Sequence, residues 1–318
     1  MKKILSLLLI ALLLTSCPAE SYGYVNLFLE RDRKAPRLLD YDLKENRICI
    51  LTFDETVSIT DARMDGCTVY RSGSMTRMAM LTLSREIQPG KAETLFFSAE
   101  DKAGNTSRFA LKLVGINLTQ APLIITEVSM KGTSQAPDRI ELTATGSGST
   151  GGYAVLDGII GYENHAFHLP DIMMNKNDII VIYWDKCDAL PPTLIRDMEK
   201  TYYLFAESDE TLIGTNGGVI LYSHTNGKGK VEDAFLYNTS DATNNNGYGN
   251  EASEESVKYL SSIGEWSGET FRSDYVTSSR VAARYYPYQD TDSASDFYVT
   301  APRMSTFGYP NTNVIYEP

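Results

Sequence analysis

Three carboxylates lie close together in the segment Asp290–Asp296. A hard cation such as Ca²⁺ binds several oxygen ligands at short range, and one loop holding Asp290, Asp292 and Asp296 could supply side-chain and backbone oxygens. The central glycine and distal glutamate of an EF-hand loop are missing from this segment. Calcium is therefore the one cofactor that the pattern suggests, and an ordinary solvated turn is the alternative interpretation.

Basic and aromatic residues gather just before that loop. They are Arg280, Arg284, Tyr285, Tyr286 and Tyr288. Tyrosine combines an apolar ring with a polar tip and suits binding faces. This run, together with Trp266, therefore predicts a contact surface for a protein or glycan partner. The alternative is packing at an edge strand, with the arginines paired to nearby acids.

Other candidate chemistry is sparse. His165 and His168 have a spacing that could share a metal on a helix, but the surrounding residues favour a strand or loop. Glu127 and Glu141 could form a pair of carboxylates within strands. The sequence contains no phosphate-binding glycine loop before Lys-Ser or Lys-Thr and no Gly-x-Ser-x-Gly elbow. We therefore expect no enzymatic activity.

The cysteines indicate export rather than catalysis. Cys49 and Cys67 fall within one predicted domain, where an exported chain could join them in a disulfide. Two separate thiols are the alternative. Cys187 has no evident partner and no histidine near it in the sequence.

Cys17 ends the long apolar run of the chain. Lys2 and Lys3 precede that run, and its apolar stretch is too short to span a bilayer as a stable helix. The tetrapeptide Leu14–Cys17 resembles the lipobox of bacterial lipoproteins. The resemblance implies cleavage before Cys17, a diacylated thioether and an acylated amine, which together make a stable membrane anchor. An ordinary secretory signal is the alternative.

Composition sets the broad class. The chain has 318 residues, a formal net charge of −12 and 42% hydrophobic residues, enough for two domains with real cores. This acidity disfavours nucleic acid as a partner. The lipobox resemblance implies a lipid-anchored protein of the cell envelope. No Asp follows Cys17, which in enteric bacteria favours the outer membrane over the inner one.

Turn signals divide the region 35–115 into short β-rich segments, as in an all-β sandwich. Asp101–Asn105 predicts a tight hairpin turn, with Gly104 in a left-handed conformation. Phe53–Val57 followed by Ala99–Asn105 resembles bacterial immunoglobulin-like domains, which serve as spacers or adhesive modules. Before this domain we expect a signal peptide at 1–16 and a tether at 17–34.

The region 121–312 contains a second ordered set of strand motifs. They are Ile124–Val128, Asp138–Leu142, Gly218–Tyr222, Val231–Tyr237, Ser279–Val281, Asp290–Phe297 and Gly308–Asn311. Taken in order, they resemble lamin-tail domains, which implies an immunoglobulin-like β-sandwich. Two inserts depart from the pattern, at 186–211 and 238–278. We expect a short helix at Pro192–Leu204 in the first insert.

These observations predict an all-β protein with two immunoglobulin-like β-sandwich domains in tandem. The expected function is a non-catalytic binding, adhesive or structural role at the cell envelope, with the membrane contacted through acyl chains on Cys17. The alternatives are a calcium-dependent binding module and a metal-assisted envelope hydrolase.

Overall fold

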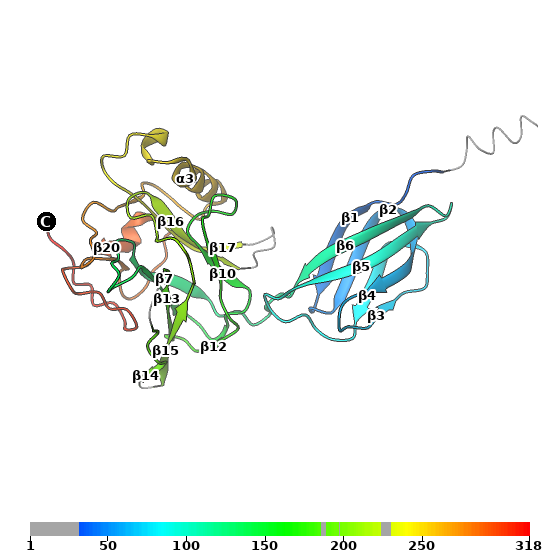
Figure 1. Cartoon of the computed structure of the whole chain (residues 1–318), viewed down its shortest axis with the longest axis horizontal. Coiled ribbons are helices and arrows are strands. Elements are labelled where there is room, and N and C mark those ends of the chain that lie inside the picture. Colours follow the sequence, from blue (N-terminus) through cyan, green and yellow to red (C-terminus); the bar gives the residue numbers. More distant parts are fainter. Residues whose placement is uncertain (1–31, 186–188, 197, 224–229) are drawn as a thin grey trace, which may run out of the picture. The chain divides into compact units, whose positions relative to one another are not determined.

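The computed structural model describes residues 32–185, 189–196, 198–223 and 230–318. The regular secondary structure of this part of the chain is mostly β-strand, which confirms the predicted all-β class. It separates into two compact units (Figure 1). The first holds the described residues up to Glu86 and the stretch Glu93–Leu113, and the second holds Ile87–Ala92 and Val114–Pro318.

A six-stranded sheet forms the first unit. Its strands are β1 (Leu38–Lys44), β2 (Ile48–Arg63), β3 (Val69–Arg71), β4 (Thr76–Leu83), β5 (Ala92–Asp101) and β6 (Thr106–Val114). They lie in the order β3-β4-β2-β5-β6, with β1 also on β2. The long β2 pairs with β1 and β4 mainly through its first half and with β5 through its second.

Alternating apolar residues build the core of this unit. Every second residue of the early part of β2 is buried, namely Cys49, Leu51 and Phe53. Phe53 packs edge-on against the rings of Phe97 and Phe109, with centroids 6.4 and 5.9 Å away. Period-two burial is what a pleated strand with one core face requires, and it is found in one of the β-rich segments predicted for the region 35–115.

The predicted hairpin turn joins β5 to β6. Asp101 accepts hydrogen bonds from the backbone N–H groups of Ala103 and Asn105, at 2.7 and 2.8 Å. Gly104 has φ = 85°, a conformation that glycine adopts without a steric penalty. The side chain of Asp101 thus organises the turn, as the spacing Asp-x-x-Gly-Asn predicted.

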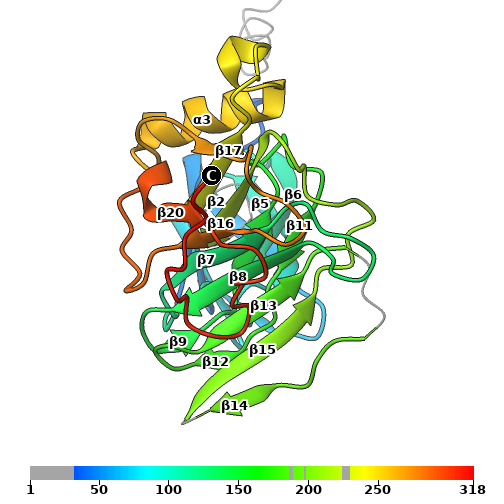
Figure 2. The same cartoon turned by 90° about the vertical axis from the view of Figure 1, so that its left-hand side faces the viewer.

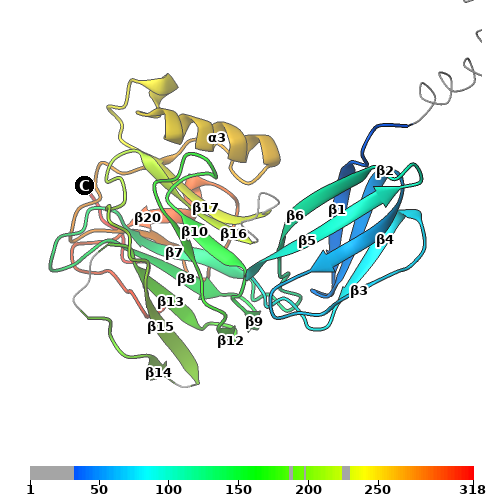
Figure 3. The same cartoon turned by 45° about the vertical axis from the view of Figure 1, so that its right-hand side comes forward.

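Two larger sheets and a two-stranded ribbon make up the second unit (Figures 2 and 3). The seven-stranded sheet contains β7 (Leu123–Ser129), β8 (Arg139–Ala144), β13 (Ile179–Tyr183), β14 (Leu194–Arg196), β15 (Glu199–Phe205), β19 (Ala282–Arg284) and β20 (Phe297–Val299). The five-stranded sheet contains β10 (Tyr153–Leu156), β11 (Ala166–His168), β16 (Gly217–Ser223), β17 (Lys230–Asn238) and β18 (Phe271–Arg272). The ribbon pairs β9 (Gly148–Ser149) with β12 (Met173–Met174).

The main core of this unit lies between its two large sheets. Ile125, Leu142 and Ile180 come from the seven-stranded sheet, and Val219 and Phe235 come from the five-stranded one. All five side chains are fully buried. Two sheets that share one apolar interior form a sandwich.

One α-helix, α3 (Glu251–Ile263), lies along β16 and β17 in both views of Figures 1 and 3. Val257 and Leu260 of α3 pack with Trp266 against the face of the five-stranded sheet that points away from the main core. Asn250 caps the start of the helix, and Gly264 ends it with φ = 81°. Both faces of the β16–β17 pair are therefore covered. Two short 3-10 turns, η1 (Asn245–Gly247) and η2 (Ala294–Asp296), are the remaining elements of the described residues.

The prediction of a short helix at Pro192–Leu204 is wrong. That stretch forms β14 and β15, and β15 pairs in parallel with β13 from Ile179↔Thr201 to Tyr183↔Phe205. The spacing of Ile195, Met198 and Tyr202 matches a helical period, but Met198 has φ = 78° and a side chain 88% exposed. Sheet pairing decides the structure of this insert, since β-propensity depends strongly on the neighbouring strand.

Candidate functional site

Arg284 lies at the centre of a buried charge cluster rather than on the surface. It ends β19, and its guanidinium donates to both oxygens of Asp233 at 2.7 and 2.8 Å. Nη1 also donates to Asp290 at 3.1 Å and to Asp296 at 3.3 Å. The expectation that Arg284 forms part of a contact surface is therefore wrong. Three acids around one fully buried guanidinium hold β17, β19 and the following loop together.

The same cluster explains the loop predicted to bind calcium. Asp296 accepts from the hydroxyl of Thr291 at 2.5 Å and from its N–H at 2.9 Å, and it shares Arg284 with Asp290. Asp292 lies partly buried beside them, and its pKa is raised by burial and by the charges of Asp290 and Asp296. Asp290 and Asp296 thus meet at a cation of the protein itself, and the three acids do not form one of the described groups whose ligand atoms lie within 4.8 Å of one another.

Among the described residues, the acidic oxygens that do converge belong to the first unit. They are those of Asp32, Glu55 and Asp101, which lie within 4.8 Å of one another. Asp101 already accepts three hydrogen bonds, two from N–H groups of the β5–β6 turn and one from the Asn105 side chain. We assign no ion to this group, because its most buried member already has its hydrogen-bond partners within the turn.

Trp266 is also buried, with 2% of its surface exposed, beneath α3. The prediction that it forms a contact surface is therefore wrong. The insert that holds Trp266 is rich in Asn, Ser and Glu. An amphipathic helix uses such residues on its outer face and still needs an apolar inner face.

Two of the four remaining residues of the predicted contact surface, Tyr285 and Tyr286, are exposed. Tyr285 and Tyr286 are 38% and 53% exposed, and Tyr285 stacks at a tilt on Tyr298 with centroids 4.7 Å apart. Tyr288 turns inward, and its hydroxyl accepts from the Asn311 N–H at 3.1 Å. Arg280 is half-buried over the ring of Tyr316, at 4.1 Å. The predicted set thus divides into an exposed tyrosine pair, Tyr285 and Tyr286, and two less accessible residues, Tyr288 and Arg280.

The tyrosine pair sits on a fixed backbone. Asn313 accepts from the Tyr286 N–H at 2.8 Å and donates to the Tyr286 carbonyl at 2.7 Å. Directly beneath, the buried Arg284 holds the end of β19 through its donation to the Ile125 carbonyl of β7 at 2.8 Å. Both contacts fix the backbone that carries the two tyrosines, which lowers the backbone entropy that a binding partner must remove.

Glu127 and Glu141 do form a pair. They lie opposite each other on β7 and β8 and are fully buried. Glu127 accepts from the Thr306 N–H at 3.0 Å, and Glu141 accepts from the Gly308 N–H at 2.6 Å. Burial raises the pKa of Glu127 to about 7, and burial together with the charge of Glu127 raises that of Glu141. Because neither carboxyl is accessible, the pair fastens the segment 306–308 to the sheet and is not placed to act on a substrate.

Of the two alternatives for Cys49 and Cys67, the structure shows separate thiols and no disulfide. Both described cysteines are free thiols. Cys49 is buried in β2, and burial raises its pKa to about 12. Cys67 lies beyond the end of that strand with its sulfur 3.5 Å from the Ser84 hydroxyl. Cys17, Cys187 and His224 lie outside the described residues.

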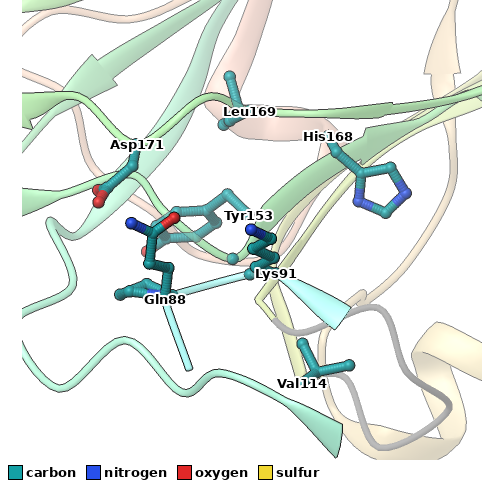
Figure 4. A pocket seen from close by; sticks show the side chains of 10 residues that line it. Gln88, Lys91, Val114, Tyr153, His168, Leu169 and Asp171 are labelled. Carbon is teal, nitrogen blue, oxygen red and sulfur yellow. The ribbon is translucent and has the colours of Figure 1, made fainter. Parts of the chain in front are cut away.

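The two described histidines do not meet at a metal site. The ring of His165 lies 2.9 Å, through Nε2, from the Ala206 carbonyl and packs edge-on against Trp184. His168 lines a cavity of about 270 Å³ with Gln88, Lys91, Tyr153 and Asp171. All residues that line this cavity belong to the second unit. Figure 4 shows Tyr153 between Asp171 and His168. The Tyr153 hydroxyl donates to the Ala121 carbonyl at 2.8 Å and is therefore already paired.

A second cavity, of about 410 Å³, lies at the start of α3. It is bordered by the loop after β10, the first residues of β16 and the first turn of the helix. Sequence reasoning missed it because its walls come from three stretches that lie about 30 to 100 residues apart along the chain. The available signal was Asn250 before an Ala/Ser/Glu run, which is an N-cap followed by good helix formers.

Comparison with known proteins gives one family. A family profile described as "protein second domain" (TP_1001_2nd) matches residues 121–299, which is more than half of the chain. No curated protein and no solved structure matches the chain. Among the described residues, no helix combines the length and the apolar character needed to cross a membrane.

Proposed function

The chain belongs to the TP_1001_2nd family of second domains, and from that premise we propose a non-catalytic binding protein that is held at the cell envelope by lipid. In this proposal residues 35–115 act as a bacterial immunoglobulin-like spacer. Residues 121–312 form a lamin-tail-like sandwich that makes the contacts. The acyl chains on Cys17 attach the protein to a membrane, which we place at the outer membrane.

One observation favours this function over catalysis, namely the exposed pair Tyr285 and Tyr286 on an immobilised backbone. Tyrosines of this kind supply large contact areas at a low entropic cost and are enriched among residues that dominate binding energy. In the second unit, Glu127 and Glu141 are sequestered, and Asp233, Asp290 and Asp296 are paired with Arg284. A protein or glycan partner is the ligand we propose for the tyrosine pair.

The test uses the polypeptide without residues 1–17 and isolated cell-envelope fragments. We expect the fragments to retain the unmodified protein, and a Tyr285→Ala/Tyr286→Ala variant to bind about tenfold more weakly or worse. Tyr70→Ala is the matched control, because Tyr70 is 59% exposed but lies in the first unit. Equal retention of the double variant and the unmodified protein would contradict the proposal, as would turnover of envelope material.

A further inference from the structure

A third cavity, of about 330 Å³, lies in the first unit. Strands β2, β5 and β6 supply its walls. The lining residues are Asp61, Arg63, Phe96, Phe97, Ser98, Arg108 and Phe109. All of them belong to one compact unit, and the volume lies within the range of small-molecule sites. The cavity is therefore a candidate site that is independent of the second unit.

Strand alternation places an aromatic ring and two arginines on the outer face of this unit. Phe97 is buried and stacks on Phe109, with ring centroids 4.8 Å apart. The residues just before them in the chain, Phe96 and Arg108, therefore project from the opposite side of their strands. Arg63 lies opposite Phe96 in the pairing of β2 with β5, and its guanidinium stands 5.2 Å from the centre of the Phe96 ring.

Both arginines can be reached from solvent and have free donors. The side chains of Arg63 and Arg108 are exposed, and among the described residues no acid pairs with either of them. Arg85 of the same unit, by contrast, is paired with Glu93 at 2.6 Å. A guanidinium presents its N–H groups as a planar fork that matches the two oxygens of a carboxylate. The cavity thus offers two such forks to an anion from outside the protein.

The remaining lining restricts the kind of anion. Asp61 is exposed and lies opposite Ser98, so the lining carries two positive charges and one negative charge. A ligand with one negative charge balances the excess, whereas a ligand with several would meet the Asp61 carboxylate. Asp61 can accept hydrogen bonds from ligand hydroxyls. Phe96, which is 38% exposed, needs an apolar face against it.

We infer that this cavity binds a sugar of the uronic acid type, which combines one carboxylate with hydroxyls and an apolar ring face. The carboxylate accepts from Arg108, and the sugar oxygens accept from Arg63. The hydroxyls donate to Asp61, and the apolar face contacts the exposed part of Phe96. This assigns a binding site to the unit that the proposed function treats as a spacer. It shares no residue with the tyrosine pair and does not depend on that function.

The test measures binding of glucuronate, glucose and glucosamine to the polypeptide without residues 1–17, by titration in saturation-transfer NMR. We expect glucuronate to bind with a millimolar or tighter Kd. Glucose and glucosamine should bind at least about fivefold more weakly, because neither has a carboxylate. Arg108→Gln should weaken glucuronate binding about fivefold and leave the binding of glucose nearly unchanged.

Arg77→Gln provides the matched control. Arg77 is also exposed in the first unit but does not line the cavity, so this change removes the same charge elsewhere and should alter the Kd of glucuronate by less than about twofold. Both variants should keep the thermal unfolding midpoint of the unmodified protein, because both positions are exposed.

Three results overturn the inference. Glucuronate fails to bind or binds no more tightly than glucose. Arg108→Gln binds glucuronate as tightly as the unmodified protein. Arg77→Gln weakens the binding of glucuronate as much as Arg108→Gln does, which would mean that only the overall charge of the protein matters.

Discussion

At the scale of single residues, charged groups in the interior of the second unit hold its loops against its strands. Arg284 contacts three acids and the backbone carbonyls of Ile125 and Gln289. Glu127 and Glu141 bind the backbone of residues 306–308. Each set of contacts fixes a loop that could not be held by apolar packing alone, because the loop offers mainly backbone N–H and C=O groups.

The glutamate pair predicts a particular dependence on pH. Folding raises the pKa of both carboxyls above the value near 4.5 of an unfolded chain, so the folded state retains protons that the unfolded state releases. The stabilising contribution of the pair is complete below about pH 4.5 and is lost as the pH rises through 7. We expect Glu141→Gln to make the decline in stability between these pH values shallower, by about 1–3 kcal/mol.

Tryptophan fluorescence gives the measurement, because both tryptophans, Trp184 and Trp266, lie in the second unit. Denaturant midpoints would be compared at pH 5 and pH 8 for the unmodified protein and the variant. Asp138 and Asp233 also have a raised pKa, at about 6 and about 7, mainly because of burial. These two acids contribute in the same direction to the unmodified protein and to Glu141→Gln. The difference between the pH dependences of stability of the two proteins therefore reports on Glu127 and Glu141. Identical slopes would contradict the prediction.

Arg284 gives a second prediction at this scale. Arg284→Met leaves Asp233 fully buried without its cation, and breaking a buried ion pair in this way costs about 3–5 kcal/mol. Arg280→Met is the control, because Arg280 is half-buried over Tyr316 and pairs with no buried acid among the described contacts. Denaturant unfolding followed by tryptophan fluorescence should show a large loss for the first variant and less than about 1 kcal/mol for the second. Equal losses of unfolding free energy for the two variants would contradict the role of Arg284 in holding these elements together.

At the scale of elements, α3 and the β14–β15 pair show how each insert is absorbed into the sandwich. The first insert extends the seven-stranded sheet, and the second covers the outer face of the five-stranded one. In both cases the insert supplies a missing partner, either for backbone groups at a sheet edge or for apolar side chains on a sheet face.

The end of α3 offers a test at this scale. Gly264 has φ = 81° and open space where a Cβ would stand, so Gly264→Ala imposes backbone strain without a clash. We expect a loss of about 1–2 kcal/mol in the unfolding of the second unit. Gly73→Ala is the control, since Gly73 also has open space but no left-handed φ. If both substitutions have the same effect, α3 does not end as described.

At the scale of the whole molecule, the proposed lipid anchor determines where the protein acts. With Cys17 acylated, the protein should partition into the detergent phase of a Triton X-114 extraction and incorporate labelled palmitate. Cys17→Ala should move nearly all of it to the aqueous phase and abolish the label. Cys49→Ala, which alters a thiol buried in β2, serves as the control and should partition like the unmodified protein. Label on Cys17→Ala would rule out Cys17 as the anchor.

The sequence by itself determined the all-β class, most strands and the β5–β6 turn, because period-two apolar patterns and turn residues act over a few neighbouring positions. Only the tertiary structure decided that Arg284 and Trp266 are buried, that residues 199–205 form a strand and that a cavity opens beside Asp157 and Ser253. Each of these depends on partners far away in the chain. Asp233, for instance, lies 51 residues before Arg284, and no local pattern records which distant acid a given arginine will meet.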